Sequence, residues 1–127
     1  MSGRPFTVFL VAGEESGDML GAGLMQALSE RLGGEVRFVG VGGRRMEALG
    51  LASRFPMEEI SLHGFTAVIA RLPRLLKLIR GTAAAVVAER PDVFVGIDAP
   101  DFNLRVARRV RRSGAPVATV HYVSPTV

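Results

Sequence analysis

The chain has no cysteine and no tryptophan, and only one tyrosine and two histidines among its 127 residues. Without cysteine it can form neither a disulfide nor a thiolate metal site, and His63 and His121 alone are too few for a histidine zinc site. Every apolar run is interrupted well before the roughly 20 residues that a membrane-spanning helix requires. We therefore expect no disulfide, no bound metal and no membrane-spanning helix in these residues.

Basic side chains are in excess and unevenly distributed. The chain has 16 Lys and Arg against 12 Asp and Glu, a net charge of +4, and the excess lies between Arg71 and Arg112. Such a concentration favours an anionic partner, which could be a phosphate group, a membrane surface or a nucleic acid. Composition alone does not choose among them.

Apolar stretches of two kinds alternate along the chain. Short continuous runs are typical of buried strands, and longer segments with apolar residues three or four positions apart are typical of helices with one buried face. Strands are predicted over residues 6–12, 36–41, 93–97 and 117–123, with a weaker one over 51–55. Helices are predicted over residues 19–32, 44–49, 65–89 and about 101–113. This alternation predicts a single α/β domain with a parallel sheet and helices on both faces.

The strand over residues 93–97 leads into a polar loop that carries Asp98, Asp101 and Asn103. In open α/β sheets, ligands bind at the carboxyl ends of the strands. Asp98 directly follows the strand and has no helix to cap, so we interpret it as a catalytic or ligand-binding carboxylate. For Asp101 we favour a simpler role as the N-cap of the following helix.

Two turns rich in glycine follow the first two strands. The turn at 13–18, GEESGD, lacks the spacing of a dinucleotide loop, and its carboxylates would repel a pyrophosphate. It could hydrogen-bond a ligand with many hydroxyl or amide groups, or Ser16 or Asp18 could cap the first helix. The turn at 40–46 carries Arg44 and Arg45, which could hold a phosphate or could be solvated side chains of a tight turn.

The segment 65–80 combines many Leu and Ile residues with regularly placed cations. Pro73 lies inside it, and because an interior proline costs about 3 kcal/mol we expect a break in the helix there. The mixture of apolar and basic side chains suits an element that meets anionic lipid, although an ordinary crossover helix packed on the sheet is the alternative. The five arginines of the helix at 102–113 are interpreted as a solvated face, because no aromatic residues are interleaved for base stacking.

Four sequence blocks together resemble the amino-terminal part of the lipid-A-disaccharide synthase family. They are VAGEESGDMLGAGL at 11–24, FVGVGGRRMEALG at 38–50, PDVFVGIDAPDFN at 91–103 and HYVSPTV at 121–127. The resemblance implies the Rossmann-like amino-terminal half of a glycosyltransferase of the GT-B fold, inverting and independent of metals and cofactors. It implies transfer of 2,3-diacylglucosamine from its UDP derivative to 2,3-diacylglucosamine 1-phosphate, with release of UDP. The expected location is cytoplasmic, peripheral on the inner face of the bacterial inner membrane.

The resemblance also assigns roles to particular residues. Asp98 is expected to be the general base that deprotonates the 6-hydroxyl of the acceptor. The residues expected to bind substrate are Glu15, Ser16, Gly17, Asp18, Arg44 and Asn103. The residues expected to meet the membrane are Phe65, Ile69, Leu72, Arg74, Leu75, Leu76 and Lys77.

We expect residues 1–127 to form one acceptor-side domain of a longer protein. The last predicted strand ends only four residues before the chain does, and the family continues with a second domain that binds the UDP-sugar. The chain alone is therefore expected to be inactive. The alternative is a non-catalytic α/β module that binds an anionic lipid or a sugar phosphate, and a nucleic-acid partner is not expected.

Overall fold

The computed structural model describes residues 4–61 and 65–123, with the side chains of the second range described from residue 69 onward. Strands and helices alternate along the chain, which confirms the predicted α/β class. The elements are β1 (Phe6–Ala12), α1 (Glu15–Arg31), β2 (Val36–Val41), α2 (Arg44–Ala48), the 3₁₀ helix η1 (Met57–Glu59), α3 (Phe65–Glu89), β3 (Val93–Ile97), α4 (Pro100–Arg112) and β4 (Ala118–Tyr122).

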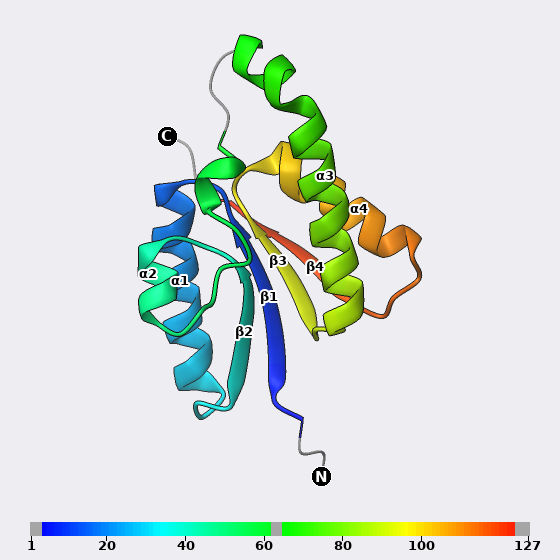
Figure 1. Cartoon of the computed structure of the whole chain (residues 1–127). Helices are drawn as coiled ribbons and strands as arrows, with labels where there is room; N and C mark the ends of the chain where they lie inside the picture. Colours follow the sequence, from blue (N-terminus) through cyan, green and yellow to red (C-terminus); the bar gives the residue numbers. More distant parts are fainter. Residues whose placement is uncertain (1–3, 62–64, 124–127) are drawn as a thin grey trace.

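The strands form one parallel sheet in the order β2-β1-β3-β4. Helices α1 and α2 lie on one side of the sheet, and α3 and α4 lie on the other (Figure 1). The chain moves outward from β1 to β2, then returns across the sheet through α3 to place β3 on the other side of β1. The connection therefore reverses direction between β1 and β3, and ligands of open α/β sheets bind at the carboxyl end of such a reversal.

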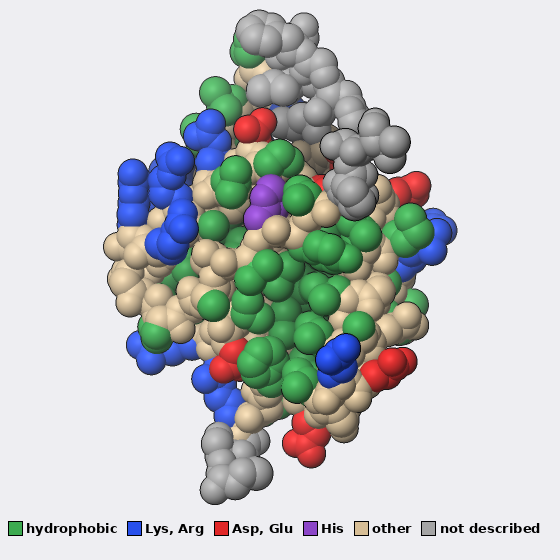
Figure 2. Space-filling view, turned by 180° about the vertical axis from the view of Figure 1, so that it is seen from behind, with side chains coloured by type: hydrophobic (Ala, Val, Ile, Leu, Met, Phe, Trp, Pro, Cys, Tyr) green, Lys and Arg blue, Asp and Glu red, His purple; other side chains and the backbone are tan. Residues whose placement is uncertain are grey.

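The two central strands lie in the middle of the core. Residues 8–12 of β1 are fully buried, and the rings of Phe9 and Phe94 lie with centroids 6.1 Å apart. Strand β1 is apolar on both faces because helices cover both faces. By contrast, β4 is an edge strand whose Val120 and Tyr122 remain exposed, and the rear view shows apolar side chains gathered across this face (Figure 2).

Three expectations about the elements were wrong. Helix α1 begins at Glu15 and not at the predicted residue 19. Helix α3 runs without a break through Pro73. Proline removes the hydrogen bond to the carbonyl four residues earlier, but Ile69 and Pro73 are both exposed, so solvent can satisfy that carbonyl. The weaker strand predicted over residues 51–55 is reduced to one isolated parallel bridge between Gly40 and Ser53.

The expected helix caps also differ from those observed. Helix α1 begins at Glu15 with Glu14 as its N-cap, so Ser16 and Asp18 lie inside the helix and do not cap it. The N-cap of α4 is Ala99, and Pro100 takes the first helical position, where a missing N–H costs nothing. Asp101 is thus the second residue of α4 and not its cap, although its carboxylate still favours the positive end of the helix dipole.

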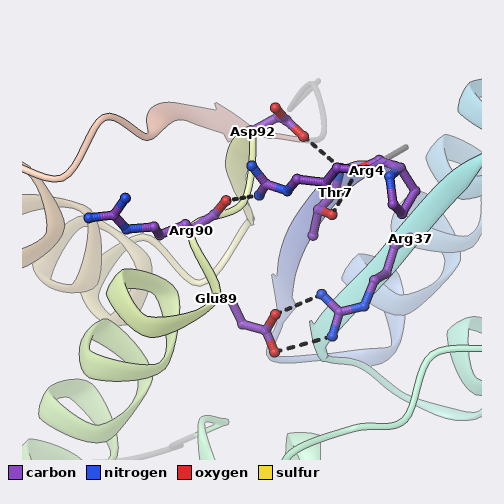
Figure 3. Close-up of polar contacts among 7 residues, drawn as sticks. Arg4, Thr7, Arg37, Glu89, Arg90 and Asp92 are labelled. Atoms are coloured by element: carbon purple, nitrogen blue, oxygen red, sulfur yellow. Dashed lines mark hydrogen bonds and ion pairs between the residues drawn. The ribbon is translucent and has the colours of Figure 1, made fainter. Parts of the chain in front are cut away.

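Polar contacts fasten the amino ends of the strands to the end of α3 (Figure 3). Asp92 accepts a hydrogen bond from the backbone N–H of Thr7 at 2.7 Å, and Arg4 donates to the carbonyl of Arg90. Arg37 on β2 donates to both carboxylate oxygens of Glu89, at 2.7 and 3.3 Å. These contacts join segments that are more than 50 residues apart in the sequence.

The Arg37–Glu89 pair predicts a small, pH-dependent contribution to stability. The hydrogen bond from Arg37 lowers the pKa of Glu89, and burial opposes that effect. A lowered pKa stabilises the folded state above the unfolded pKa, and this contribution is lost as the pH falls through the folded pKa. We expect Glu89→Gln to reduce the free energy of unfolding by about 0.2–1 kcal/mol at pH 7, as for other exposed pairs, and to have little effect at pH 3.

Urea denaturation at the two pH values measures this difference. Glu30→Gln, at an exposed position of α1, is the matched control and should change neither value. An equal loss for Glu89→Gln at pH 7 and pH 3 would contradict a charge-based role.

Candidate functional site

The carboxyl ends of β1 and β3 deliver their loops to the same edge of the sheet, because the two strands pair in parallel with Ala12 beside Ile97. A cavity of about 240 Å³ lies between these loops and α3. It is lined by Gly13, Glu14, Ile60, Ser61, Leu75, Ala99, Pro100, Asp101 and Phe102. Its wall thus combines apolar side chains with two carboxylates, at the point where the direction of the chain reverses.

A larger cleft of about 840 Å³ lies beside the start of α1. It is lined by Glu15, Ser16, Asp18, Met19, Gly43, Arg44, Arg45, Met57 and Glu58. The structure therefore brings together Glu15, Ser16 and Asp18 from α1 with Arg44 from α2, four of the residues expected to bind substrate. Glu15, Ser16 and Arg44 are exposed, so their polar groups are accessible from the cleft.

Asp18 differs from its neighbours because its carboxylate is already occupied. The residue is only 4% exposed, and its two oxygens accept hydrogen bonds from the backbone N–H groups of Gly43, Arg45 and Met46 at 2.9, 3.0 and 3.1 Å. These are the free amides at the start of α2, so Asp18 caps α2 from outside. It fixes the position of Arg44 relative to α1.

Gly17 is buried and lies against the sheet. A side chain there would start 3.3 Å from the Cβ of Ala12 and 3.5 Å from Cγ2 of Ile97. The glycine therefore allows α1 to pack closely over the ends of β1 and β3. Its effect on the site is to place the first turn of α1, with Glu15 and Ser16, near the sheet edge.

Asp98 occupies a strained turn between β3 and α4. Asp98 and Ala99 have φ values of +49° and +41°. Aspartate adopts this left-handed conformation more readily than most residues, whereas for Ala99 it costs roughly 1–2 kcal/mol. The backbone N–H of Asp98 donates to the carbonyl of Tyr122 at 3.0 Å, which ties the turn to β4. Asp98 is half-buried and directly precedes Ala99, which lines the smaller cavity.

Asn103 holds this turn from within the protein. Its side chain is buried, and Nδ2 donates to the carbonyl of Asp98 at 2.9 Å and to that of Val11 at 3.2 Å. Gly96 makes the room, because a Cβ there would lie 2.7 Å from Cβ of Asn103. Asn103 thus joins the ends of β1 and β3, and it reaches the candidate site through the backbone of Asp98 rather than through the cleft.

Helix α3 carries all the residues expected to meet a membrane. Ile69, Leu72 and Leu76 are 57%, 44% and 43% exposed, and their spacing places them on one face of the helix. We call these three residues the apolar stripe. Leu75 instead lines the smaller cavity, and Arg74 forms an ion pair with Glu59 at 2.7 Å.

Two other expectations concern the membrane and metals. Lys77 is exposed, whereas the side chain of Phe65 lies outside the described residues. Within the described ranges no helix is long and apolar enough to cross a membrane. The same residues contain no group of three His, Cys, Asp or Glu side chains that could hold a metal ion.

Several lining residues were missed from the sequence. Ile60 and Ser61 in the smaller cavity, and Met57 and Glu58 in the larger cleft, lie in or just after the 3₁₀ helix η1. This segment is too short to show a helical or strand period, so only its folded position reveals it. Glu14 is one of the carboxylates of the turn at 13–18 that were expected to be able to hydrogen-bond a ligand, and it lines the smaller cavity.

The capping contacts predict that Asp18 supports the site structurally. Asp18→Asn replaces one acceptor oxygen with an NH₂ group that faces backbone donors, so we expect the free energy of unfolding to fall by about 1–3 kcal/mol. Urea denaturation of the chain measures this loss. Glu15→Gln, at an exposed position of the same helix, is the control and should change stability by less than about 0.5 kcal/mol. Equal stability of the two variants would contradict the prediction that Asp18 stabilises the start of α2.

The chain is similar in sequence to known proteins of one family. The family model of lipid-A-disaccharide synthetase matches residues 8–127. A lipid-A-disaccharide synthase of Rhodopseudomonas palustris (strain ATCC BAA-98 / CGA009) is 59% identical over 124 residues, which is 98% of this chain and 32% of the relative. One from Sodalis glossinidius is 54% identical over 127 residues, all of this chain and 32% of the relative.

The chain spans about a third of the length of these curated relatives. The matched region includes every strand and helix described above except the first two residues of β1. Since the match covers nearly the whole chain, the chain belongs to the lipid-A-disaccharide synthetase family.

Proposed function

We propose that this chain is the amino-terminal, acceptor-side domain of an inverting glycosyltransferase that forms the lipid A disaccharide. The whole enzyme would transfer 2,3-diacylglucosamine from its UDP derivative to 2,3-diacylglucosamine 1-phosphate and release UDP. Membership of the family supports this proposal, and so does the meeting of the β1 and β3 loops at one edge of the sheet. The second domain, which would bind the UDP-sugar, belongs to the part of the relatives that this chain does not span.

Asp98 is the proposed general base. Its carboxylate takes the proton of the acceptor 6-hydroxyl while that oxygen bonds to the anomeric carbon of the donor. The bond from the anomeric carbon to the phosphate oxygen breaks, and its electron pair leaves with UDP. Attack opposite the leaving group inverts the anomeric centre. A positioned base of this kind typically contributes about 10²–10⁴ in rate, and the tied turn at Asp98 supplies the positioning.

The exposed polar residues of the larger cleft are proposed to hold the sugar and its phosphate. Glu15 and Ser16 can exchange hydrogen bonds with hydroxyl and amide groups. Arg44, at the start of α2, can pair with the phosphate of the acceptor. Asp18 and Asn103 act on these groups indirectly, through α2 and through the Asp98 turn.

The apolar stripe is proposed to rest on the cytoplasmic face of the inner membrane. Ile69, Leu72 and Leu76 are exposed on the same helix from which Leu75 lines the smaller cavity. Helix α3 therefore has one face toward the proposed bilayer and another toward the sheet edge. This arrangement would shorten the path of acyl chains between the membrane and the site, and it supports a peripheral location.

A chimera tests the role of Asp98. This chain would replace the matching segment of the Rhodopseudomonas palustris relative, and UDP release would be followed with both lipid substrates. We expect Asp98→Asn to lower kcat by about 10²-fold or more. The left-handed turn should persist, because asparagine adopts this conformation readily, so thermal unfolding should be unchanged.

Asp101→Asn is the matched control in the same loop. Asp101 also lines the smaller cavity, but it is exposed and lies within α4, so its variant should lose much less activity than Asp98→Asn. Normal turnover by Asp98→Asn, or a larger loss for Asp101→Asn, would assign the base to another residue. A chimera that binds the acceptor but stays inactive with Asp98 intact would favour a non-catalytic binding module.

The purified 127-residue chain should release no UDP from the two substrates. The reason is that the proposed donor site lies outside the third of the relatives that the chain spans. The unsubstituted chimera, assayed at the same concentration, is the positive control. Turnover by the chain alone would show that its own residues bind and activate the donor.

A further inference from the structure

A groove of about 290 Å³ lies between α3 and α4, on the layer opposite α1 and α2. It is lined by Leu76, Ile79, Arg105, Arg108, Arg109 and Arg112, and we call it the arginine groove. In the rear view, basic side chains gather along the margin on the side of α4 (Figure 2). None of these arginines belongs to the candidate site at the carboxyl edge.

The residues that the structure describes do not neutralise the charges of the arginine groove. Within residues 4–61 and 65–123, none of its four arginines forms an ion pair with a carboxylate. The arginines are spaced three and four residues apart on α4, and like charges at these spacings destabilise a helix. The dipole of α4 offsets part of this repulsion near its carboxyl end. An anion bound in the groove would relieve the rest.

The groove is continuous with an exposed apolar surface. Leu76 lines the groove and is also the last member of the apolar stripe. Basic side chains beside exposed aliphatic ones suit a membrane surface, where the cations meet headgroups and the aliphatic groups enter the lipid. Single-stranded nucleic acid is a poorer fit, since the groove has no aromatic lining residue on which a base could stack.

We propose that the arginine groove binds the phosphodiester headgroups of anionic phospholipids. The inference rests on the proposed membrane association and adds to it a lipid class and a second contact surface. Helix α3 would enter the interface with its apolar stripe, and the adjoining helix α4 would hold headgroup phosphates. The two contacts have different signatures, because the arginine groove distinguishes anionic from zwitterionic lipid and the apolar side chains of the stripe do not.

Vesicle sedimentation of the chain tests the proposal. Phosphatidylcholine vesicles with and without phosphatidylglycerol would be compared at low salt. We expect Arg105→Gln/Arg109→Gln to lower partition into the anionic vesicles roughly 10- to 30-fold, on the basis of the usual contribution of one basic side chain near such a surface. Both positions are exposed, so the fold should persist, as circular dichroism would verify.

The control is Arg31→Gln/Arg111→Gln, which removes the same charge elsewhere. Arg31 ends α1, and Arg111 lies on α4 but lines a different cavity beside β4. This variant should retain most of the binding. Equal losses of binding for the two double variants would show an effect of net charge alone and would overturn the proposal. A wild-type chain with no preference for phosphatidylglycerol would overturn it as well.

A third variant separates the groove from the apolar stripe. Ile69→Ser/Leu72→Ser should weaken binding to both kinds of vesicle and leave the preference for phosphatidylglycerol unchanged. If this variant binds both kinds of vesicle as the wild type does, the apolar stripe does not contact the membrane, and the proposal for the arginine groove is unaffected. If an oligonucleotide or inorganic phosphate binds at the same arginines more tightly than the vesicles do, the lipid assignment is wrong.

Discussion

The parallel pairing of β1 with β3 is the constraint on which the rest of the structure depends. It sets Val8 beside Val93 and Ala12 beside Ile97, and it buries both strands between the two helical layers. Because both strands run in the same direction, the loops that follow them meet at one edge. The polar groups assigned to the candidate site lie in the loops and helix starts at that edge or on α2 beside it.

One side chain converts this pairing into a defined turn. Asn103 reaches back from α4 to the carbonyls of Val11 and Asp98, and Gly96 leaves the space for it. The arrangement is costly, since Asp98 and Ala99 are left-handed and Oδ1 of Asn103 is buried without a hydrogen-bond partner among the described residues. A strained backbone of this kind persists only where several surrounding contacts hold it in place. The contacts of Asn103 do so here, which is consistent with a turn whose shape matters for the site.

Sequence patterns predicted the elements whose burial is set locally. The bounds of β1, β2 and β3 were predicted correctly. The two central strands, β1 and β3, were the easiest to recognise, because a strand covered on both faces is a nearly continuous apolar run. The break expected at Pro73 was wrong. An interior proline breaks a helix when the carbonyl that loses its hydrogen bond cannot find another partner, but this face of α3 is exposed to solvent. The role of Asp18 was missed because the amides that it caps lie 25 to 28 residues further along the chain. No local pattern contains that contact.

The two helical layers differ in the chemistry that they present. Helices α1 and α2 place exposed Glu15, Ser16 and Arg44 around the larger cleft, whereas α3 and α4 present the apolar stripe and the arginine groove. Helices α3 and α4 both reach from the smaller cavity to the groove. Leu75 lines the cavity and Leu76 lines the groove on α3, and on α4 Phe102 lines the cavity and Arg105 lines the groove. A ligand with a polar head and acyl chains would need such a boundary. The unbroken course of α3 past Pro73 keeps the two surfaces in a fixed relation.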